Sequence, residues 1–372
     1  MILSDMLVVE LASVLAGPSL GMFLAEQGAN VIKIENPRIG GDVTRSWRLS
    51  TESQEDDRSA YFCAVNWGKK SLALDLKNED DLEKVKVLIS KADILISSFR
   101  PGQALQYGLD ADELLAKHPS LIVASISGYG PDDSRPAFDA IIQAETGFTY
   151  LNGPADVGRT KMPVALMDIL AAHQLKQAVL LALLRRAKTD KGGHVQVDLL
   201  RAGLSSLANQ ATNYLVAGVA PEPIGSAHPN IAPYGEVFDT STGPVVLAVG
   251  NDRQFKALCN VLDWDAPAIY ASNKDRVRQR SSLNESLKRH MRNWNRDILL
   301  QALAEAGVPA GPINTIPEAL NLPQAQTVRL HDGGLSGLRS FIAQMGTPGA
   351  DLEAPPHLNE HESHIHQAFF TG

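Results

Sequence analysis

Short apolar runs alternate with helix-like runs along the first 130 residues, and this alternation constrains the fold more than any other feature. The apolar runs have the length and composition of buried strands: 6–11, 30–35, 71–76, 93–99 and 121–130. The runs between them have the spacing of helices: 17–29, 78–92 and 111–119. Repeated alternation of this kind is typical of parallel strands with helices on both faces of the sheet. The sequence therefore predicts an α/β fold with a doubly wound, mainly parallel sheet.

The rest of the chain indicates a second domain. Two long helical stretches, 165–188 and 198–217, follow the alternating region, with a short strand between them. Residues 218–244 are rich in Gly and Pro and are predicted to be a loop. A strand follows at 245–252, and further helices are predicted at 253–263, 283–292 and 297–306. The predicted domains are a large one over 1–217 and a small α/β one over 225–315.

Composition and charge argue against several classes of partner. Lys and Arg total 34 against 42 Asp and Glu, a net charge of -8, so the chain as a whole does not attract nucleic acid or an anionic membrane. Cys63 and Cys259 lie far apart and match no metal or redox spacing, which favours buried thiols in a reducing compartment. The first residues lack a basic segment, and the apolar run 178–184 is too short to span a bilayer. We expect a soluble, cytoplasmic protein.

Two motifs are better explained by ordinary structure than by chemistry. Residues 17–21, GPSLG, match the nucleophile elbow of hydrolases, but Pro18 restricts the turn and no downstream Asp and His stand out as partners. No G-x-G-x-x-G occurs in this turn and no P-loop occurs in the chain. Four histidines lie near the C-terminus without a clear set of further ligands, so we expect a solvated tail and no metal site: His357, His361, His364 and His366.

Basic residues follow or flank several of the predicted strands. They are Lys33, Arg45, Arg48, Lys69, Lys70 and Arg100. Each of them, taken alone, is typical of a solvated surface charge. Ligands of open α/β sheets bind beyond the carboxyl ends of the strands, so together these cations predict a positive pocket for a polyphosphate ligand.

One carboxylate, Asp168, lies among apolar residues where a long helix is predicted to begin. A carboxylate removed from water is costly unless other groups satisfy it. One interpretation is a structural carboxylate, stabilised by the helix dipole and by free N–H groups at the helix start. The other is a nucleophile or base in a partly dry cleft. The local sequence leaves both interpretations open.

An ordered set of segments covers nearly the entire chain: ASVLAGP (12–18), GANVIKIENPRIGGDVTRSW (28–47), NWGKKSLALDLK (66–77), ADILISSFRPG (92–102), YGLD (107–110), ASISGYGPDDSRPAFDAIIQAETG (124–147), PVALMDILAAHQ (163–174), KGGHVQVDLL (191–200), PYGEVF (233–238) and GVPAGPI (307–313). This set resembles the class III coenzyme A transferases, the family of formyl-CoA transferase and carnitine-CoA transferase. The resemblance implies coenzyme A as a substrate and no prosthetic group. It also implies that 316–372 completes the large, CoA-binding domain over 1–217, and that two chains are threaded through each other as an interlocked homodimer.

The resemblance also implies a role for Asp168, which matches the catalytic aspartate of the family. That carboxylate would attack the thioester carbonyl of an acyl-CoA, giving an aspartyl-acyl anhydride and CoA thiolate, and later steps would return CoA to a different acid. Gln106 and Asn36 stand where the family has arginines, and Arg38 and Arg100 are the candidates to replace them. The implied CoA-binding residues are Val14, Leu15, Arg38, Lys69, Lys70, Ser98, Phe99, Arg100, Ala137 and Asp139. Tyr129 and Gln143 are candidates to line the acyl pocket.

A related branch, the α-methylacyl-CoA racemases, is the alternative. Its aspartate also matches Asp168, but its catalytic histidine precedes an aspartate in a GHD run. The matching run here is AFD, with Phe138 in place of the histidine, and phenylalanine cannot transfer a proton. We therefore expect a transferase rather than a racemase or isomerase.

The resemblance bears on the acceptor acid as well. The loop 225–238 lacks the long glycine run that formyl-CoA transferases place over their site. It looks more like the loop of dicarboxylate-using members, for which succinyl-CoA is a common donor. His228 and Tyr234 are candidates to bind a distal carboxylate. We expect a small dicarboxylic or hydroxy-dicarboxylic acceptor.

Overall fold

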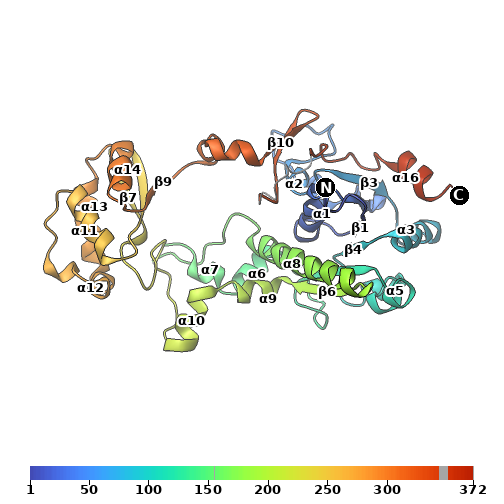
Figure 1. The fold of residues 1–372 in the computed structure, drawn as a ribbon, viewed down its shortest axis with the longest axis horizontal. Helices are drawn as coiled ribbons and strands as arrows, with labels where there is room; N and C mark the ends of the chain where they lie inside the picture. Colours follow the sequence, from blue (N-terminus) through green and yellow to red (C-terminus); the bar gives the residue numbers. More distant parts are fainter. Residues whose placement is uncertain (155, 343–350, 372) are drawn as a thin grey trace. The chain divides into compact units, whose positions relative to one another are not determined.

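The computed structural model describes residues 1–154, 156–342 and 351–371, and the chain divides into two compact units (Figure 1). Unit 1 comprises Met1–Thr146, Pro163–Ser206 and Gln326–Gly372, and unit 2 comprises Gly147–Met162 and Leu207–Ala325. The boundary differs from the predicted one because the helix expected over 198–217 is two helices, α9 (Leu199–Ser205) and α10 (Ala208–Ala217). Ala208, the first residue of α10, has a φ of +47°, which the interior of a continuous α-helix does not accommodate. The unit boundary falls at this break.

Unit 1 is built on a six-stranded sheet whose neighbouring strands are all parallel. The strands, in spatial order, are β3 (Lys69–Ala73), β2 (Asn30–Glu35), β1 (Leu7–Leu11), β4 (Ile94–Ser97), β5 (Ile122–Ser127) and β6 (Gly193–Asp198). The order reverses between β1 and β4, and open sheets bind ligands beyond the carboxyl ends of the strands at such a point. The predicted α/β fold with a mainly parallel sheet is confirmed.

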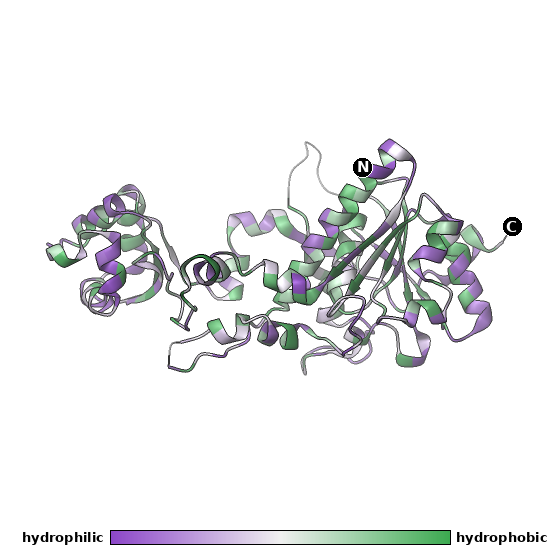
Figure 2. Cartoon of the chain, turned by 90° about the horizontal axis from the view of Figure 1, so that it is seen from below, coloured by the Kyte–Doolittle hydropathy of each residue, from purple (hydrophilic) through white to green (hydrophobic). Residues whose placement is uncertain are grey.

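Helices cover both faces of this sheet, so its strands are apolar on both sides (Figure 2). Val9 of β1 pairs with Ile32 and Leu95 of the adjacent strands, and all three are buried. The helical segments of unit 1 are η1 (Pro37–Ile39), η2 (Val43–Ser46), α1 (Ala16–Glu26), α2 (Ala60–Cys63), α3 (Glu79–Lys91), α4 (Gln103–Gln106), α5 (Ala111–Lys117), α6 (Asp139–Glu145), α8 (Leu166–Thr189), α9 and α16 (Glu362–Phe369). A hairpin of β10 (Arg329–Asp332) and β11 (Leu335–Leu338) completes the unit.

Helix α8 packs on α1, α9, β5 and β6. Among the described residues it is the one helix long and apolar enough to cross a membrane, and 44% of its most apolar window is buried within the structure. A core helix passes the same test of length and composition. The contacts of α8 with the sheet are those of a core helix.

The C-terminal segment is part of unit 1, and three of the four histidines expected in a solvated tail are exposed: His357, His364 and His366. It runs beside β3, the edge strand, where Gly68 donates its N–H to the carbonyl of Glu353 at 2.9 Å. Ala73 donates its N–H to Asn359 Oδ1 at 2.8 Å, and His361 donates its N–H to the carbonyl of Ser71 at 3.2 Å. An edge strand carries unpaired backbone groups, and the tail satisfies these.

Unit 2 holds a three-stranded antiparallel sheet of β7 (Tyr234–Thr240), β8 (Gly243–Ala248) and β9 (Ala310–Pro312). Its core includes Phe238, Leu247 and Leu258. The helical segments are α7 (Phe148–Leu151), α10, α11 (Asp252–Val261), η3 (Ala268–Tyr270), α12 (Asn273–Arg278), α13 (Arg280–Met291), α14 (Arg296–Glu305) and α15 (Ile316–Leu320), and η4 (Pro323–Val328) spans the boundary with unit 1. The loop predicted over 218–244 is wrong from Tyr234 onwards, because pairing with β8 outweighs the local glycine and turn signals.

Candidate active site

The turn between β1 and α1 brings backbone N–H groups to the carboxyl end of the sheet. Val14 in this turn has a φ of +72°, a left-handed conformation that costs a side-chain-bearing residue about 1–3 kcal/mol. Its N–H donates to both carboxylate oxygens of Asp42, each at 3.3 Å. Two residues later α1 begins, and the N–H of Ala16 is close enough to the carboxylate of Asp168 to lower its pKa.

Asp168 lies in the first turn of α8 and is buried, with 9% of its surface exposed. Burial raises the pKa of its carboxyl to about 7, and the nearby charge of Asp139 raises this pKa further, against the N–H groups of Ala16 and of Asp168 itself, which lower it. A carboxyl with this pKa is divided between its acid and its ionised form near neutral pH. The arrangement therefore supplies a poorly solvated carboxylate that can act as a nucleophile or a base.

Asp139 and Gln143 of α6 form the neighbouring part of the site. Asp139 Oδ1 accepts the N–H of Met167 at 2.8 Å, which ties α6 to the start of α8. Asp139 Oδ2 accepts a hydrogen bond from Gln143 Nε2 at 2.8 Å. Gln143 is fully buried, so its side chain supports Asp139 in this structure rather than lining the open cavity.

A cavity of about 280 Å³ opens beside Asp168. Its walls are the β1–α1 turn, the turn after β4, the end of β5 and the segment leading into α6. The predicted CoA-binding residues that line it are Val14, Ser98, Phe99, Arg100, Ala137 and Asp139. Phe138, the residue in the racemase histidine position, also lines it and is 58% exposed. Leu15 is half-buried and is the N-cap residue of α1.

A second cavity, of about 290 Å³, lies beyond the carboxyl ends of β1, β2, β3 and β4. It shares four lining residues with the first: Ser13, Val43, Ser98 and Phe99. The two cavities therefore adjoin along the end of the sheet, at the reversal of strand order where the fold class places ligands. An extended ligand can occupy both.

The predicted positive pocket is wrong for three of its cations, whose side chains are buried and paired. Lys69 Nζ lies 2.8 Å from Glu10 Oε2, Lys33 Nζ lies 3.0 Å from Glu10 Oε1, and Arg45 Nη2 lies 2.7 Å from Glu35 Oε1. A charge carried into the interior by a strand or turn must be paired there, and this requirement determines where the three side chains point. The ammonium of Lys69 is thus no longer a candidate to contact CoA.

The remaining predicted cations lie at the surface. Arg100 lines the cavity beside Asp168 and is exposed. Arg38 is exposed and forms an ion pair with Asp75. Lys70 Nζ lies 3.4 Å from His364 Nε2 on α16, and Arg48 donates to the carbonyls of Arg45 and Ser53.

The predicted acyl-pocket and acceptor residues lie in different units. In unit 1, Tyr129 is buried beneath Arg135, whose guanidinium lies 3.9 Å from the ring centre, and its hydroxyl donates to Glu145 at 3.2 Å. In unit 2, His228 and Tyr234 contact each other edge to face, with ring centres 5.3 Å apart. The structure thus brings Asp168, Asp139 and Gln143 together in unit 1 and leaves His228 and Tyr234 paired in unit 2.

Sequence reasoning missed Tyr61, on α2. Burial raises the pKa of its hydroxyl, and the charges of Asp168, Asp139 and Asp42 add to this effect. Its ring packs edge to face on Trp47, with ring centres 5.1 Å apart. No local sequence pattern predicts that Tyr61 or Trp47 belongs to a site, because only the folded chain brings them near the carboxylates.

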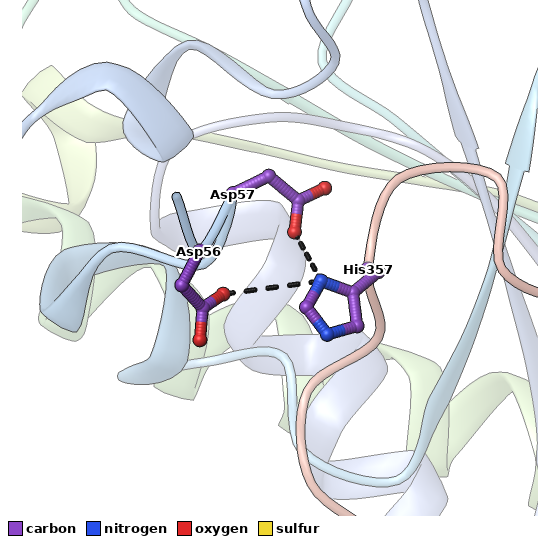
Figure 3. Close-up of side chains that lie close together, drawn as sticks. All are labelled: Asp56, Asp57 and His357. Atoms are coloured by element: carbon purple, nitrogen blue, oxygen red, sulfur yellow. Dashed lines mark hydrogen bonds and ion pairs between the residues drawn. The ribbon is translucent and has the colours of Figure 1, made fainter. Parts of the chain in front are cut away.

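Within the described part of the chain, one group of side chains lies close enough together to hold a metal ion, Asp56, Asp57 and His357 (Figure 3). His357 Nδ1 lies 2.5 Å from Asp57 Oδ1 and 3.8 Å from Asp56 Oδ1. Asp56 is also held by Arg58, and Asp57 Oδ2 accepts the N–H of Leu358 at 2.6 Å. These contacts join the C-terminal segment to the loop before α2, so the group has a structural explanation.

The family model described as CoA-transferase family III matches residues 3–362, and the chain belongs to this family. It is therefore an enzyme that transfers coenzyme A between acids and uses CoA thioesters as substrates. The family expected from the sequence is confirmed.

Particular relatives place the chain more closely within the family. It is 38% identical to the succinate–glutarate CoA-transferase of Agrobacterium fabrum, over 98% of this chain and 94% of that protein. It is 30% identical to the human succinyl-CoA:glutarate CoA-transferase, over 96% of this chain and 84% of that protein. Among solved structures, a CAIB/BAIF family protein from Brucella suis is 38% identical, covers 98% of both chains and superposes with a TM-score of 0.86.

Proposed function

We propose that this enzyme moves CoA from succinyl-CoA to a small dicarboxylic acid through an acyl anhydride on Asp168. The observation that carries the proposal is the carboxylate of Asp168 at the wall of a cavity, buried enough to raise its pKa to about 7. A carboxylate that has lost most of its hydration is more reactive toward a carbonyl carbon than one in water. An anhydride also keeps the acyl group activated, as a serine ester would not.

The proposed reaction consists of balanced acyl exchanges. An oxygen of Asp168 bonds to the thioester carbonyl carbon, the carbon–sulfur bond breaks, and CoA leaves as the thiolate. The thiolate then attacks the aspartyl carbonyl, which releases succinate and leaves CoA as a thioester on Asp168. The acceptor carboxylate attacks that thioester, CoA leaves again, and its attack on the acceptor carbonyl gives the new acyl-CoA and free Asp168. The Ala16 N–H is a candidate donor to the oxygen that gains charge at this centre.

The two adjoining cavities supply a path for CoA. The nucleotide would lie in the cavity beyond β1 to β4, and the pantetheine arm would pass Ser98 and Phe99 to reach Asp168. Arg100 at the cavity wall, with Arg38 and Lys70 at the surface, are the candidate phosphate ligands. We retain Val14, Leu15, Ala137 and Asp139 as CoA contacts through the turns that they form.

The choice of acids is supported by the relatives. Two of them are named for transfer between succinate or succinyl-CoA and glutarate, and a third, from Haloarcula hispanica, for succinyl-CoA and mesaconate. These acids are all small dicarboxylates, as expected from the loop 225–238. We propose glutarate as the first acceptor to test, with His228 and Tyr234 binding its distal carboxylate.

We also propose that the enzyme acts as an interlocked homodimer in the cytoplasm. The long, partly exposed α8 and the division of each chain into two units support the first proposal. Two free, buried cysteines, Cys63 and Cys259, support a reducing compartment.

A panel of free acids assayed with succinyl-CoA tests the function. We expect glutarate or another small dicarboxylate with carbons between its two carboxyl groups to give the highest kcat/KM. Turnover with formate or oxalate alone would contradict the choice. Asp168→Ala should abolish exchange, whereas the matched Asp133→Ala change, at a partly exposed carboxylate of the same cavity, should leave most of it. Proton exchange at the α-carbon in deuterated water, without any acceptor acid, would instead indicate a racemase.

A further inference from the structure

We infer that Lys33 and Asp42 are positioning residues for the reaction, because they fix the β1–α1 turn that leads to Ala16, and Ala16 and Asp168 line the same cavity. The inference rests on the proposed role of Asp168 as the nucleophile. It assigns catalytic importance to two side chains that act through the backbone of the turn.

The contacts of Lys33 and Asp42 hold the turn at two points. Lys33 Nζ donates to the carbonyl oxygen of Ala12 at 2.7 Å and lies 2.9 Å from Asp42 Oδ2. Asp42 in turn accepts the N–H of Val14 on both oxygens, at 3.3 Å. One ammonium group therefore holds Ala12 directly and Val14 through the carboxylate, immediately before the Ala16 N–H.

The surroundings of the pair make it rigid. The side chains of Lys33 and Asp42 are 1% and 0% exposed, and Glu10 binds the other side of the ammonium at 3.0 Å. Asp42 Oδ1 also accepts the N–H of Thr44 at 3.0 Å and its hydroxyl at 2.8 Å. A buried, fully bonded carboxylate has few alternative positions, so it can hold a neighbouring backbone group in place.

The turn needs such support because of Val14. Its φ of +72° lies in the left-handed region, which a β-branched residue leaves unless other contacts hold it there. Without the carboxylate of Asp42, Val14 is expected to return to an ordinary φ. The N–H of Ala16 then moves away from Asp168.

The direction in which the pKa of Asp168 shifts distinguishes a positioning role of Asp42 from a direct effect of its charge. The groups that act on its pKa are the N–H donors of Ala16 and Asp168 and the charge of Asp139, and the Tyr61 hydroxyl is close enough to feel both carboxylates. Withdrawing the Ala16 N–H makes Asp168 harder to ionise. Removing the negative charge of Asp42 makes Asp168 easier to ionise, so the two effects have opposite signs.

The test measures kcat/KM against pH for the full-length enzyme with succinyl-CoA and glutarate. Asp42→Asn should lower kcat/KM by about 10- to 100-fold, since small displacements of catalytic groups cost factors of this size. It should also move the acid limb of the profile to higher pH. Thr44→Val changes no charge and should move the acid limb in the same direction by a smaller amount. If the Asp42→Asn enzyme does not fold, the Thr44→Val enzyme still tests the inference. Glu26→Gln removes a buried carboxylate bonded to Ser340 instead and should leave the limb in place.

The same substitution made in a Val14→Gly enzyme tests whether the effect of Asp42 passes through the backbone of the turn. Glycine adopts a φ of +72° freely, so the loss caused by Asp42→Asn should be several-fold smaller in a Val14→Gly enzyme than in the natural one. An acid limb that stays in place or moves to lower pH in both Asp42→Asn and Thr44→Val overturns the inference, as does an equal loss in the two backgrounds. Full exchange by Asp168→Ala overturns the proposed function instead, so the two failures are distinguishable.

Discussion

At the scale of single residues, the site depends on two carboxylates in an environment with little water. Asp168 lies at the start of α8 and Asp139 at the start of α6, and the charge of the second raises the pKa of the first. Both side chains are buried, so water screens their interaction poorly. The proposed nucleophile therefore reaches its full reactivity only above the pH at which it ionises.

This arrangement predicts the pH dependence of the enzyme. Because the ionised form of Asp168 is the proposed nucleophile, kcat/KM should rise with pH and level off above about pH 7, the pKa given to this carboxyl by burial and by Asp139. Asp139→Asn removes the neighbouring charge, so the acid limb should move to lower pH by about half a unit or more. Steady-state kinetics between pH 5 and 9 checks both statements, and an unmoved limb in the variant would show that Asp139 does not act through its charge.

The same pKa predicts a dependence of stability on pH. The folded pKa of Asp168, about 7, lies above its ordinary value of 3.8, so ionisation opposes folding, and stability is lost as pH rises from about 4 through 7. Asp168→Asn should therefore be more stable than the natural enzyme at pH 8, by about 1–2 kcal/mol, and this advantage should shrink toward pH 4. Urea unfolding at equal protein concentrations measures it. An advantage that is equal at both pH values would contradict the account.

The sequence predicted some of these residues and missed others for identifiable reasons. Asp168 could be found because it lies in a segment that resembles the family motif and interrupts an apolar helix. The positions of Lys33 and Lys69 beside predicted strands indicated a ligand pocket, but their side chains pair with Glu10 in the interior. The direction of a side chain depends on the partners that the fold brings to it, and Glu10 lies far from Lys69 in the sequence.

At the scale of elements, the C-terminal segment acts as a cover for the edge of the sheet. Asn359 has a φ of +61°, and its side-chain oxygen accepts the N–H of Ala73. The segment lies 286 residues from that strand in the sequence. Local patterns therefore could not place it there.

This contact predicts the effect of changing Asn359. Asn359→Ala should lower the free energy of unfolding by about 1–3 kcal/mol, since it leaves the Ala73 N–H without its acceptor and puts a less tolerant residue at a positive φ. Asn359→Gly keeps the backbone conformation and should lose less. Urea titration gives the free energies, and faster hydrogen exchange at Ala73 locates the change. Unaltered exchange at that amide would mean that the tail does not hold the strand.

At the scale of the whole molecule, the proposed dimer has to cover an apolar surface on unit 1. Leu181 and Leu184 of α8 are 67% and 54% exposed in the single chain. Leu181→Asp should therefore weaken self-association, because it places a charge on a face that the partner is proposed to cover. Val87→Asp, on the exposed side of α3, is the matched control. Sedimentation of the natural enzyme and the two variants measures self-association. An unchanged dimer in Leu181→Asp would exclude this face of α8 from the dimer contact.

The division into two units was predicted in outline and differs in detail. The parallel sheet followed from the alternation of strands and helices, which is a local property. The boundary at Leu207 depends on a break between α9 and α10, and an uninterrupted helical pattern conceals that break.

Trapping of the acylated enzyme tests the central claim most directly. Incubation with succinyl-CoA and hydroxylamine should convert the carboxylate of Asp168 to a hydroxamate, because hydroxylamine attacks the activated aspartyl carbonyl of the anhydride or thioester. Mass spectrometry of the digested protein should then find the modification on the peptide that contains Asp168, and only when succinyl-CoA is present. An enzyme that exchanges CoA at its full rate while this peptide stays unmodified would contradict the account.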